Sequence, residues 1–300
     1  GQGRMVQFLR KSVGEFYCCD INEAAIEKCN QRFFDMKNVH PFVNTVNSIP
    51  LKDNNIDAVY SLKFNDKKMQ ELDGQYFYVY EWFDGKSLKD DEITIEHCKK
   101  IGKLLAYIHN IDLKKDEVKA KTRNIDFKYY IDLAKEKDPV IYDMIYDKLN
   151  ILNESMNKGN ISVNDLPKFS AICHNDMDSK NVMWLNDDYK LIDLECLGYS
   201  NPYLELYELA LCWSGYEKCN IDFSKFSAFF QAYIENTKLD MNVDWEAIYY
   251  ANNGRLGWLE FNIKRSLMID CDTEEEKQIG INEVKETIEH VVYYDKIKDE

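Results

Sequence analysis

The sequence predicts an α+β protein whose amino-terminal part mixes strands and helices and whose remainder is mainly helical. Apolar residues make up 45% of the 300 residues and aromatic residues 13%, which is enough for a substantial core and excludes a disordered chain. Only 12 Gly and 5 Pro are present, so a turn-rich β-sandwich is disfavoured. The apolar pattern changes from strand-like to helical near residue 85, where we expect the two parts to meet.

Strand-like runs and one helical run alternate in the amino-terminal part. We expect strands at 16–21, 39–46 and 56–64 and a helix at 23–34. Asp73-Gly74 is a turn signal, and the aromatic run 75–83 after it is expected to be a strand. Residues 1–61 contain too few strands to complete a sheet alone, so we expect 56–64 and 75–83 to share one sheet.

Helical periodicity dominates after residue 85. The spacing i, i+3, i+4, i+7 of one apolar helix face is shown by Ile101, Leu104, Leu105 and Ile108. Further helices are expected at 127–152, around 206–213 and around 281–291. Short strands and a polar loop interrupt the pattern between 171 and 197.

The net charge of −15 and the cysteine pattern limit the classes of partner and compartment. A chain with 53 acidic and 38 basic residues repels phosphate backbones, which disfavours nucleic-acid binding, and it suits a cationic small molecule. No run approaches 18 apolar residues and no charged-then-apolar leader opens the chain, so neither a membrane span nor a signal peptide is expected. The nine cysteines form no C-x-x-C pair, which argues against a zinc ribbon and predicts reduced thiols in a cytoplasmic protein.

A polar loop followed by a hairpin strand carries the strongest chemical signal. The loop reads H-x-D-x-x-x-x-N over residues 174–181, and about a dozen residues later an apolar strand ends in D-x-E. An Asp in such a loop can accept the proton of an attacking hydroxyl, and an Asn and a second Asp can bind Mg²⁺ through oxygen atoms. The alternative is a surface turn and a hairpin with incidental acids, but the joint spacing favours phosphoryl transfer.

This part of the sequence resembles the aminoglycoside phosphotransferase and choline kinase family, relatives of the protein kinases. The resemblance covers roughly residues 65–300, and the segments that carry it are HNDMDSKN, LIDLE, YVYEWFDGKSL and NPYLELYELALCWSG. It implies a protein-kinase-like phosphotransferase with a mainly helical large lobe that uses ATP or GTP together with Mg²⁺. We therefore expect an atypical α/β segment at 1–62, hinge strands at 63–84 and the large lobe at 85–300.

The resemblance also implies a role for each polar residue of the loop and the strand. Asp176 would be the catalytic base, and Asn181 and Asp193 would be the metal ligands. His174 would brace the loop, although a histidine taken alone is more often structural. Glu195 would lie near the metal, behind its direct ligands.

Two further segments are expected to bind the nucleotide and the acceptor. The strand 76–83 resembles the hinge between kinase lobes, where adenine would lie against backbone groups near Glu81, Trp82 and Phe83. The carboxy-terminal helices would build an acidic cleft for a cationic acceptor, because carboxylates and indole faces attract ammonium groups. The candidates are Glu205, Glu208, Trp213 and Glu260. Each of these, taken singly, also fits a core aromatic or an exposed acid.

The amino-terminal segment departs from the kinase pattern. The usual order of glycine-rich loop, strand with Lys and helix with a paired Glu is not found there. Lys63 lies only about a dozen residues before the hinge, and Lys11 is the other candidate. Residues 1–61 instead resemble part of a class I S-adenosylmethionine methyltransferase, with a G-x-G-R start and Asp20 placed 17 residues after Gly3.

Three functions are therefore weighed. The favoured one is ATP-dependent phosphorylation of a hydroxyl on a small cationic molecule, such as an aminoglycoside, a choline-like amine or an amino sugar. The alternative is a catalytically silent kinase-like module that binds a small molecule or a partner, because an incomplete nucleotide lobe would weaken nucleotide binding. The third, methyl transfer, needs strands of the cofactor sheet that are not found, so Asp20 and Gly3 are expected to be relics.

Overall fold

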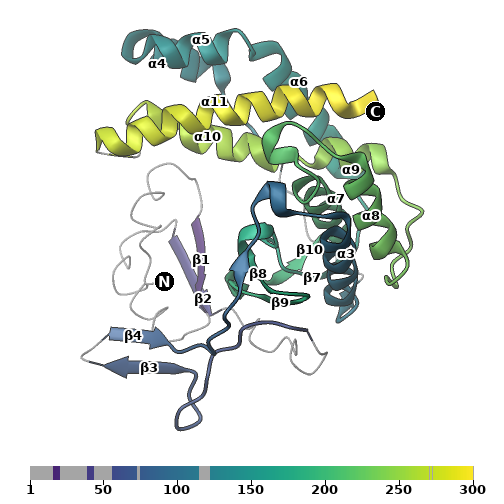
Figure 1. Cartoon of the computed structure of the whole chain (residues 1–300). Coiled ribbons are helices and arrows are strands. Elements are labelled where there is room, and N and C mark those ends of the chain that lie inside the picture. The colour runs from purple at the N-terminus through teal and green to yellow at the C-terminus, as the bar shows by residue number, and fades with distance from the viewer. Residues whose placement is uncertain are drawn as a thin grey trace.

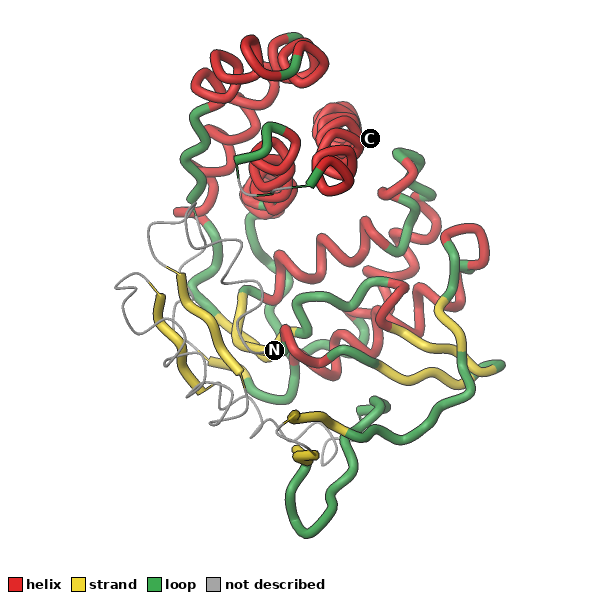
Figure 2. The backbone as a smooth tube through the Cα atoms, turned by 90° about the vertical axis from the view of Figure 1, so that its left-hand side faces the viewer, coloured by secondary structure: helices red, strands yellow, loops and turns green. Residues whose placement is uncertain are grey.

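The molecule places its helices mainly at one end and its short strands mainly at the other (Figures 1 and 2). The residues that the computed structural model describes are 16–20, 39–43, 56–72, 75–114, 122–269, 271 and 273–299. Their element order confirms the α+β class, with a mainly helical part after residue 85. None of the helices in these ranges is long and apolar enough to cross a lipid bilayer.

Two strand pairs lie in the amino-terminal part. They are formed by β1 (Phe16–Asp20), β2 (Val39–Val43), β3 (Met69–Leu72) and β4 (Gln75–Tyr78). The parallel pairing of β1 with β2 confirms the first two predicted strands. The antiparallel pairing of β3 with β4 sets Leu72 opposite Gln75. The strand predicted at 75–83 is confirmed only for 75–78, because β4 ends at Tyr78. The helix predicted at 23–34, the G-x-G-R segment and Lys11 lie outside the described residues.

Residues 56–64 bridge two partners instead of forming the expected strand. The Val59 amide donates to the Leu191 carbonyl (2.8 Å), and the Leu62 amide donates to the Val79 carbonyl (2.7 Å). Because the segment changes partner within three residues, no ladder develops, and the prediction of a strand here is wrong. The expected pairing with the aromatic segment around Val79 holds only as an isolated bridge.

The helix α3 (Ile95–His109) begins the helical part and packs closely on α8 (Phe223–Ile234). Thr94 caps its first turn by accepting a hydrogen bond from the His97 amide. The four apolar residues predicted to form one face are all buried. Gly102 allows the close approach, because a Cβ at this position would lie 2.2 Å from the Phe229 carbonyl oxygen.

The remaining helices complete the helical part. They are α4 (Phe127–Lys137), α5 (Pro139–Tyr146), α6 (Leu149–Ser162), α7 (Pro202–Cys212), α9 (Trp245–Ala251), α10 (Gly254–Ser266) and α11 (Glu274–Lys296). The run 127–152 divides where Asp138 caps α5 and Pro139 occupies its first turn. Figure 1 shows α10 and α11 side by side, and together with α4 to α6 they enclose a second apolar core.

Two small sheets position the polar loop. Their strands are β5 (Lys86–Ser87), β6 (Leu113–Lys114), β7 (Ser170–Cys173), β8 (Val182–Leu185), β9 (Asp188–Leu191) and β10 (Gly198–Ser200). One sheet has the order β10-β7-β6 and the other β5-β8-β9. The loop 174–181 runs from β7 to β8, and β9 leads to Asp193. The fold therefore carries the polar loop and Asp193 on neighbouring strands.

Candidate active site

The polar loop holds Asp176 and Asn181 against each other. Asn181 is buried at the end of a short helical turn, Ser179–Asn181. Its Nδ2 donates to both the backbone oxygen (2.8 Å) and Oδ2 (2.9 Å) of Asp176. This pairing orients the half-buried Asp176 carboxylate, and it leaves Oδ1 of Asn181 as an acceptor.

Asp193 lies beside this pair because β9 is tied to the loop. The Ile192 amide donates to the Asn181 carbonyl (3.0 Å). Asp193 adopts a left-handed backbone (φ 57°, ψ 63°), and both Asp193 and Glu195 are exposed. An amide oxygen and carboxylate oxygens are the donors that Mg²⁺ prefers, so Asn181 and Asp193 fit such a site.

A buried hydrogen-bond chain fixes the loop from beneath. Glu205 accepts hydrogen bonds from the backbone amide of Asn175 and from Nε2 of His109 (2.7 Å), while Nδ1 of His109 meets the Tyr233 hydroxyl (2.6 Å). Burial raises the pKa of Glu205, but the hydrogen bonds and charge of His109 and the Asn175 amide lower it more, so the net shift is downward. Asn175 itself has a left-handed φ of 63°, one residue before Asp176.

This hydrogen-bond network supports the loop, a role we call the brace, and it is not arranged as a metal centre. Ligand atoms of His109, Cys173 and Glu205 lie within 4.8 Å of one another. Both nitrogens of His109 already make hydrogen bonds, and Glu205 is occupied by His109 and the Asn175 amide. His174 is also buried beside the loop, and burial lowers its pKa, so its ring is neutral near pH 7. Neither ring nitrogen of His174 makes a well-formed hydrogen bond to the described part of the chain.

The expected hinge runs alongside β9. Lys190 of β9 lies 3.4 Å from the Glu81 carboxylate and 5.4 Å from the centre of the Phe83 ring. Trp82, between them, is 89% exposed and points to solvent. Burial, and then the charges of Asp193 and Glu195, raise the pKa of Tyr80, so its hydroxyl lies within electrostatic range of these two carboxylates.

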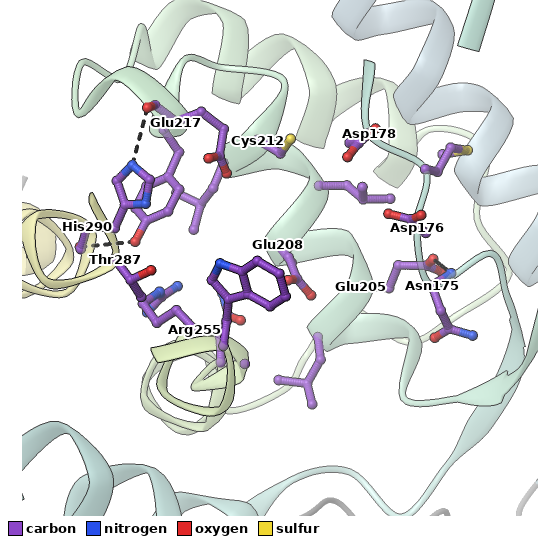
Figure 3. Close-up of a pocket in the computed structure, with 18 of the residues that line it drawn as sticks. Asn175, Asp176, Asp178, Glu205, Glu208, Cys212, Glu217, Arg255, Thr287 and His290 are labelled. Atoms are coloured by element: carbon purple, nitrogen blue, oxygen red, sulfur yellow. Dashed lines mark hydrogen bonds between the residues drawn. The ribbon is translucent and has the colours of Figure 1, made fainter. Parts of the chain in front are cut away.

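A cavity of about 830 Å³ opens between the loop and the helices α7, α10 and α11 (Figure 3). Its walls carry seven carboxylates: Asp176, Asp178, Glu205, Glu208, Glu217, Glu283 and Glu286. Arg255 is the one Lys or Arg among its described lining residues. In Figure 3 the loop residues form one wall, Arg255 and His290 belong to the opposite wall, and Glu208 lies between them. The side chain of Glu208 is accessible to solvent from the cavity, but the surrounding protein partly desolvates its carboxylate and raises its pKa; Arg255 opposes this rise, and Glu205 and Glu217 add to it.

Two of the four acceptor candidates, Trp213 and Glu260, do not line this cavity. Trp213 is 1% exposed, and its indole donates to the Met177 carbonyl (2.9 Å), so it supports the loop from within the core. Glu260 pairs with Lys264 (3.1 Å) and accepts from the Tyr130 hydroxyl (2.9 Å).

Trp258 is one of several cavity residues that are not among the expected acceptor residues. It lines the cavity, is 49% exposed and donates to the Glu283 carboxylate (2.9 Å). The helical period contained the signal. Trp213 continues the apolar face of α7 that contains Leu206 and Leu209, whereas Trp258 falls off the buried face of α10 that contains Leu259 and Ile263.

Comparison with known proteins agrees with both resemblances. The model of the phosphotransferase enzyme family matches residues 64–236, and that of a methyltransferase domain matches residues 1–74. No curated protein sequence matches the chain.

Solved structures share the fold at low sequence identity. A spectinomycin phosphotransferase in complex with ADP and spectinomycin has a TM-score of 0.58 at 13% identity, covering 82% of this chain and 80% of that one. The AMP-bound complex of this enzyme has a TM-score of 0.55 at 15% sequence identity, covering 81% of this chain and 80% of that one. An aminoglycoside phosphotransferase from Alicyclobacillus acidocaldarius has a TM-score of 0.51 at 12% identity, covering 81% of this chain and 77% of that one. With more than half of its length matched by the family model, the chain belongs to the phosphotransferase enzyme family.

Proposed function

We propose that the protein transfers the terminal phosphoryl group of ATP or GTP to a hydroxyl of a small cationic molecule. The observation that carries this proposal is the Asp176 carboxylate, which Asn181 orients and which lines a cavity whose walls have seven carboxylates, Asp176 among them, and one arginine. A hydroxyl compound with ammonium groups would be attracted into such a cavity and would meet a carboxylate at its loop wall.

The loop supplies the proton acceptor. Asn181 orients the Asp176 carboxylate, and a hydroxyl hydrogen-bonded to it would lose its proton as its oxygen attacks the γ-phosphorus. The bond from that phosphorus to the bridging oxygen breaks, and the nucleoside diphosphate leaves. Asn181 and Asp193 would hold Mg²⁺, which when bound neutralises phosphate charge.

The acceptor would lie on the helix wall. The half-exposed Trp258 offers an indole face, and the carboxylates of Glu208 and Glu283 lie around the same cavity. Cations are attracted both to indole faces and to carboxylates, so we assign acceptor binding to these three residues. This set replaces Trp213 and Glu260 with residues that reach the cavity, and Glu205 serves mainly as the brace.

The nucleotide would lie along the hinge. The side chains of Glu81 and Phe83 contact Lys190 of β9, which leads to Asp193, so a base at the hinge and phosphates at Asp193 are compatible with one nucleotide. We also propose a cytoplasmic location, because the six cysteines between Cys98 and Cys271 all carry free thiols.

Nucleoside diphosphate release and thermal shift together test this function. The wild-type chain is incubated with ATP–Mg²⁺ or GTP–Mg²⁺ and a panel of aminoglycosides, choline-like amines, amino sugars and neutral sugars. We expect product to form with at least one amine and the nucleotide to raise the melting temperature. A shift with amines but without nucleotides would favour the silent binding module. A shift with S-adenosylmethionine alone would favour methyl transfer.

A further inference from the structure

Lys180 lies in the polar loop directly before Asn181, and neither the proposed proton acceptor nor the proposed metal ligands include it. We propose that the Lys180 ammonium contacts the γ-phosphoryl group as it passes from the nucleotide to the acceptor, and that it stabilises the negative charge of this group during transfer. This inference rests on the proposed function and adds a catalytic residue to it.

The main chain of Lys180 is anchored on both sides. Its amide donates to Oδ1 of Asp178 (3.1 Å), and its carbonyl accepts from the Ser87 hydroxyl of β5 (2.8 Å). The residue also belongs to the short helical turn that ends at the buried Asn181. The position of Lys180 relative to Asp176 is therefore set by the loop and does not depend on the side chain alone.

The side chain of Lys180 points toward Asp176, the proposed proton acceptor. Nζ lies 2.7 Å from Oδ2 of Asp178 and 3.3 Å from Oδ1 of Asp176. Within the described ranges, Lys180 is the one cationic side chain in ion-pair distance of Asp176. A phosphoryl group attacked by a hydroxyl bound to Asp176 would therefore come within reach of Nζ.

The charges around the cavity explain why such a cation is needed. A terminal phosphoryl group approaches a loop that presents the carboxylates of Asp176 and Asp178, and cations must offset this repulsion. Arg255 contacts an aromatic ring in place of the loop, because its guanidinium lies 3.7 Å from the centre of the Tyr294 ring. Lys180 already bridges the two loop carboxylates, so it can share its ammonium with the incoming group.

A purely structural role would make a different prediction. The side chain of Lys180 is 66% exposed, and ion pairs at such positions contribute little to stability. Removing the ammonium should then leave both folding and chemistry almost unchanged. If Lys180 acts on the phosphoryl group, folding is unchanged but transfer is slowed.

In the proposed phosphoryl transfer, Lys180 acts only as a hydrogen-bond donor and neither gains nor loses a proton. The acceptor oxygen forms a bond to the γ-phosphorus, and its proton goes to Asp176. The bond from the γ-phosphorus to the bridging oxygen breaks, and its electron pair leaves with the nucleoside diphosphate. Lys180 keeps its proton and binds a non-bridging oxygen, where negative charge is held during transfer.

The test compares Lys180→Ala, Lys180→Arg and the control Lys99→Ala, in which an exposed lysine of α3 is removed. Calorimetry measures the Mg²⁺-dependent binding of ADP and of a non-hydrolysable ATP analogue, and ADP release measures kcat with the best acceptor, or with water if none is found. We expect Lys180→Ala to lower kcat about 100-fold. It should weaken the ATP analogue about tenfold and leave ADP unchanged. Lys180→Arg should restore most of both losses, and Lys99→Ala should behave like wild type.

Three results would overturn the inference, and they are separable. Unchanged kcat and unchanged analogue binding in Lys180→Ala would remove Lys180 from the chemistry while phosphoryl transfer stands. Equal weakening of ADP and the analogue would show a general electrostatic effect in place of contact with the terminal group. If the wild-type chain binds neither nucleotide, the proposed function itself fails, and the role of Lys180 fails with it.

Discussion

The two walls of the cavity are built differently. On the loop wall, Asn175 and Asp176 are held by hydrogen bonds to the buried side chains of Glu205 and Asn181. On the helix wall, Glu283 accepts a hydrogen bond from Trp258, whereas Glu208 and Glu286 make no hydrogen bond or ion pair with other residues in the described ranges. A fixed wall suits a reaction whose transition state needs oriented groups, whereas free carboxylates suit recognition of a ligand that supplies the partners.

The loop wall should show the largest effect on chemistry. Asp176→Asn removes the proton acceptor and keeps the shape, so kcat should fall about 10³-fold. The free energy of unfolding should change by less than about 1 kcal/mol, because the side chain is half-buried and the amide oxygen of the new Asn can still accept from Asn181. Steady-state kinetics and urea titration measure the two quantities.

Asp187→Asn is the matched control for this prediction, since Asp187 is a fully exposed residue of the β8–β9 turn. It should leave kcat unchanged. Near-normal turnover in Asp176→Asn would remove the loop from the chemistry and make the comparison of the two walls irrelevant to catalysis.

The brace beneath the loop should affect both stability and turnover. Glu205→Gln removes the charge that pairs with His109 in a buried site, so the free energy of unfolding should fall by about 3 kcal/mol. Turnover should fall as well, because the Asn175 amide loses its charged acceptor one residue before Asp176. Glu260→Gln, in a partly exposed pair outside the cavity, should cost less than about 1 kcal/mol. A stable Glu205→Gln variant with normal kcat would contradict the brace.

The pH dependence of stability isolates the charge of Glu205. Its pKa is lowered in the folded state, so its contribution is fully present above the unfolded pKa, about 4.3, and is lost as the pH falls through the folded value. Denaturant titrations between pH 3 and pH 7 should therefore show a steeper acid loss in wild type than in Glu205→Gln. Parallel curves would show that this carboxylate does not carry the acid dependence.

The sequence predicts the parts of the site that lie within one local motif, and it does not predict contacts between residues far apart in the chain. The loop 174–181 can be predicted from the sequence because Asp176 and Asn181 lie within one short motif. Asp193 can be predicted because the hairpin of β8 and β9 returns the chain to this loop. The brace was missed because His109 and Glu205 are 96 residues apart in the sequence.

The errors have equally specific causes. Residues 56–64 have a strand-like composition, but they bond to Leu191 on one side and to Val79 on the other, which no local pattern encodes. Trp213 suits a cation site by residue type, but its helical position places it on a buried face. Helical phase was the better guide, since it separates Trp213 from Trp258.

The two tryptophans provide a direct comparison of the core with the helix wall. Trp258→Ala should raise the KM of the acceptor about tenfold at unchanged kcat, because it removes a half-exposed indole face from the cavity. Trp213→Ala should instead lower the free energy of unfolding by about 4 kcal/mol, because the side chain is fully buried and supports Met177. If Trp258→Ala lowers stability and leaves KM unchanged, the indole belongs to the core and the assignment of the helix wall is wrong.

The smallest expected effect concerns salt, and it distinguishes the free carboxylates from the fixed ones. Attraction between an ammonium group and exposed carboxylates weakens with ionic strength, since the Debye length shrinks from about 10 Å at 0.1 M to about 3 Å at 1 M. The KM of a cationic acceptor should therefore rise severalfold over this range, and the slope should decrease in Glu208→Gln and Glu286→Gln, which line the helix wall. Glu274→Gln, at the exposed start of α11 and outside the cavity lining, removes the same charge and should keep the wild-type slope. A neutral acceptor that binds best, with a KM independent of salt, would show that the acidic wall does not select the substrate.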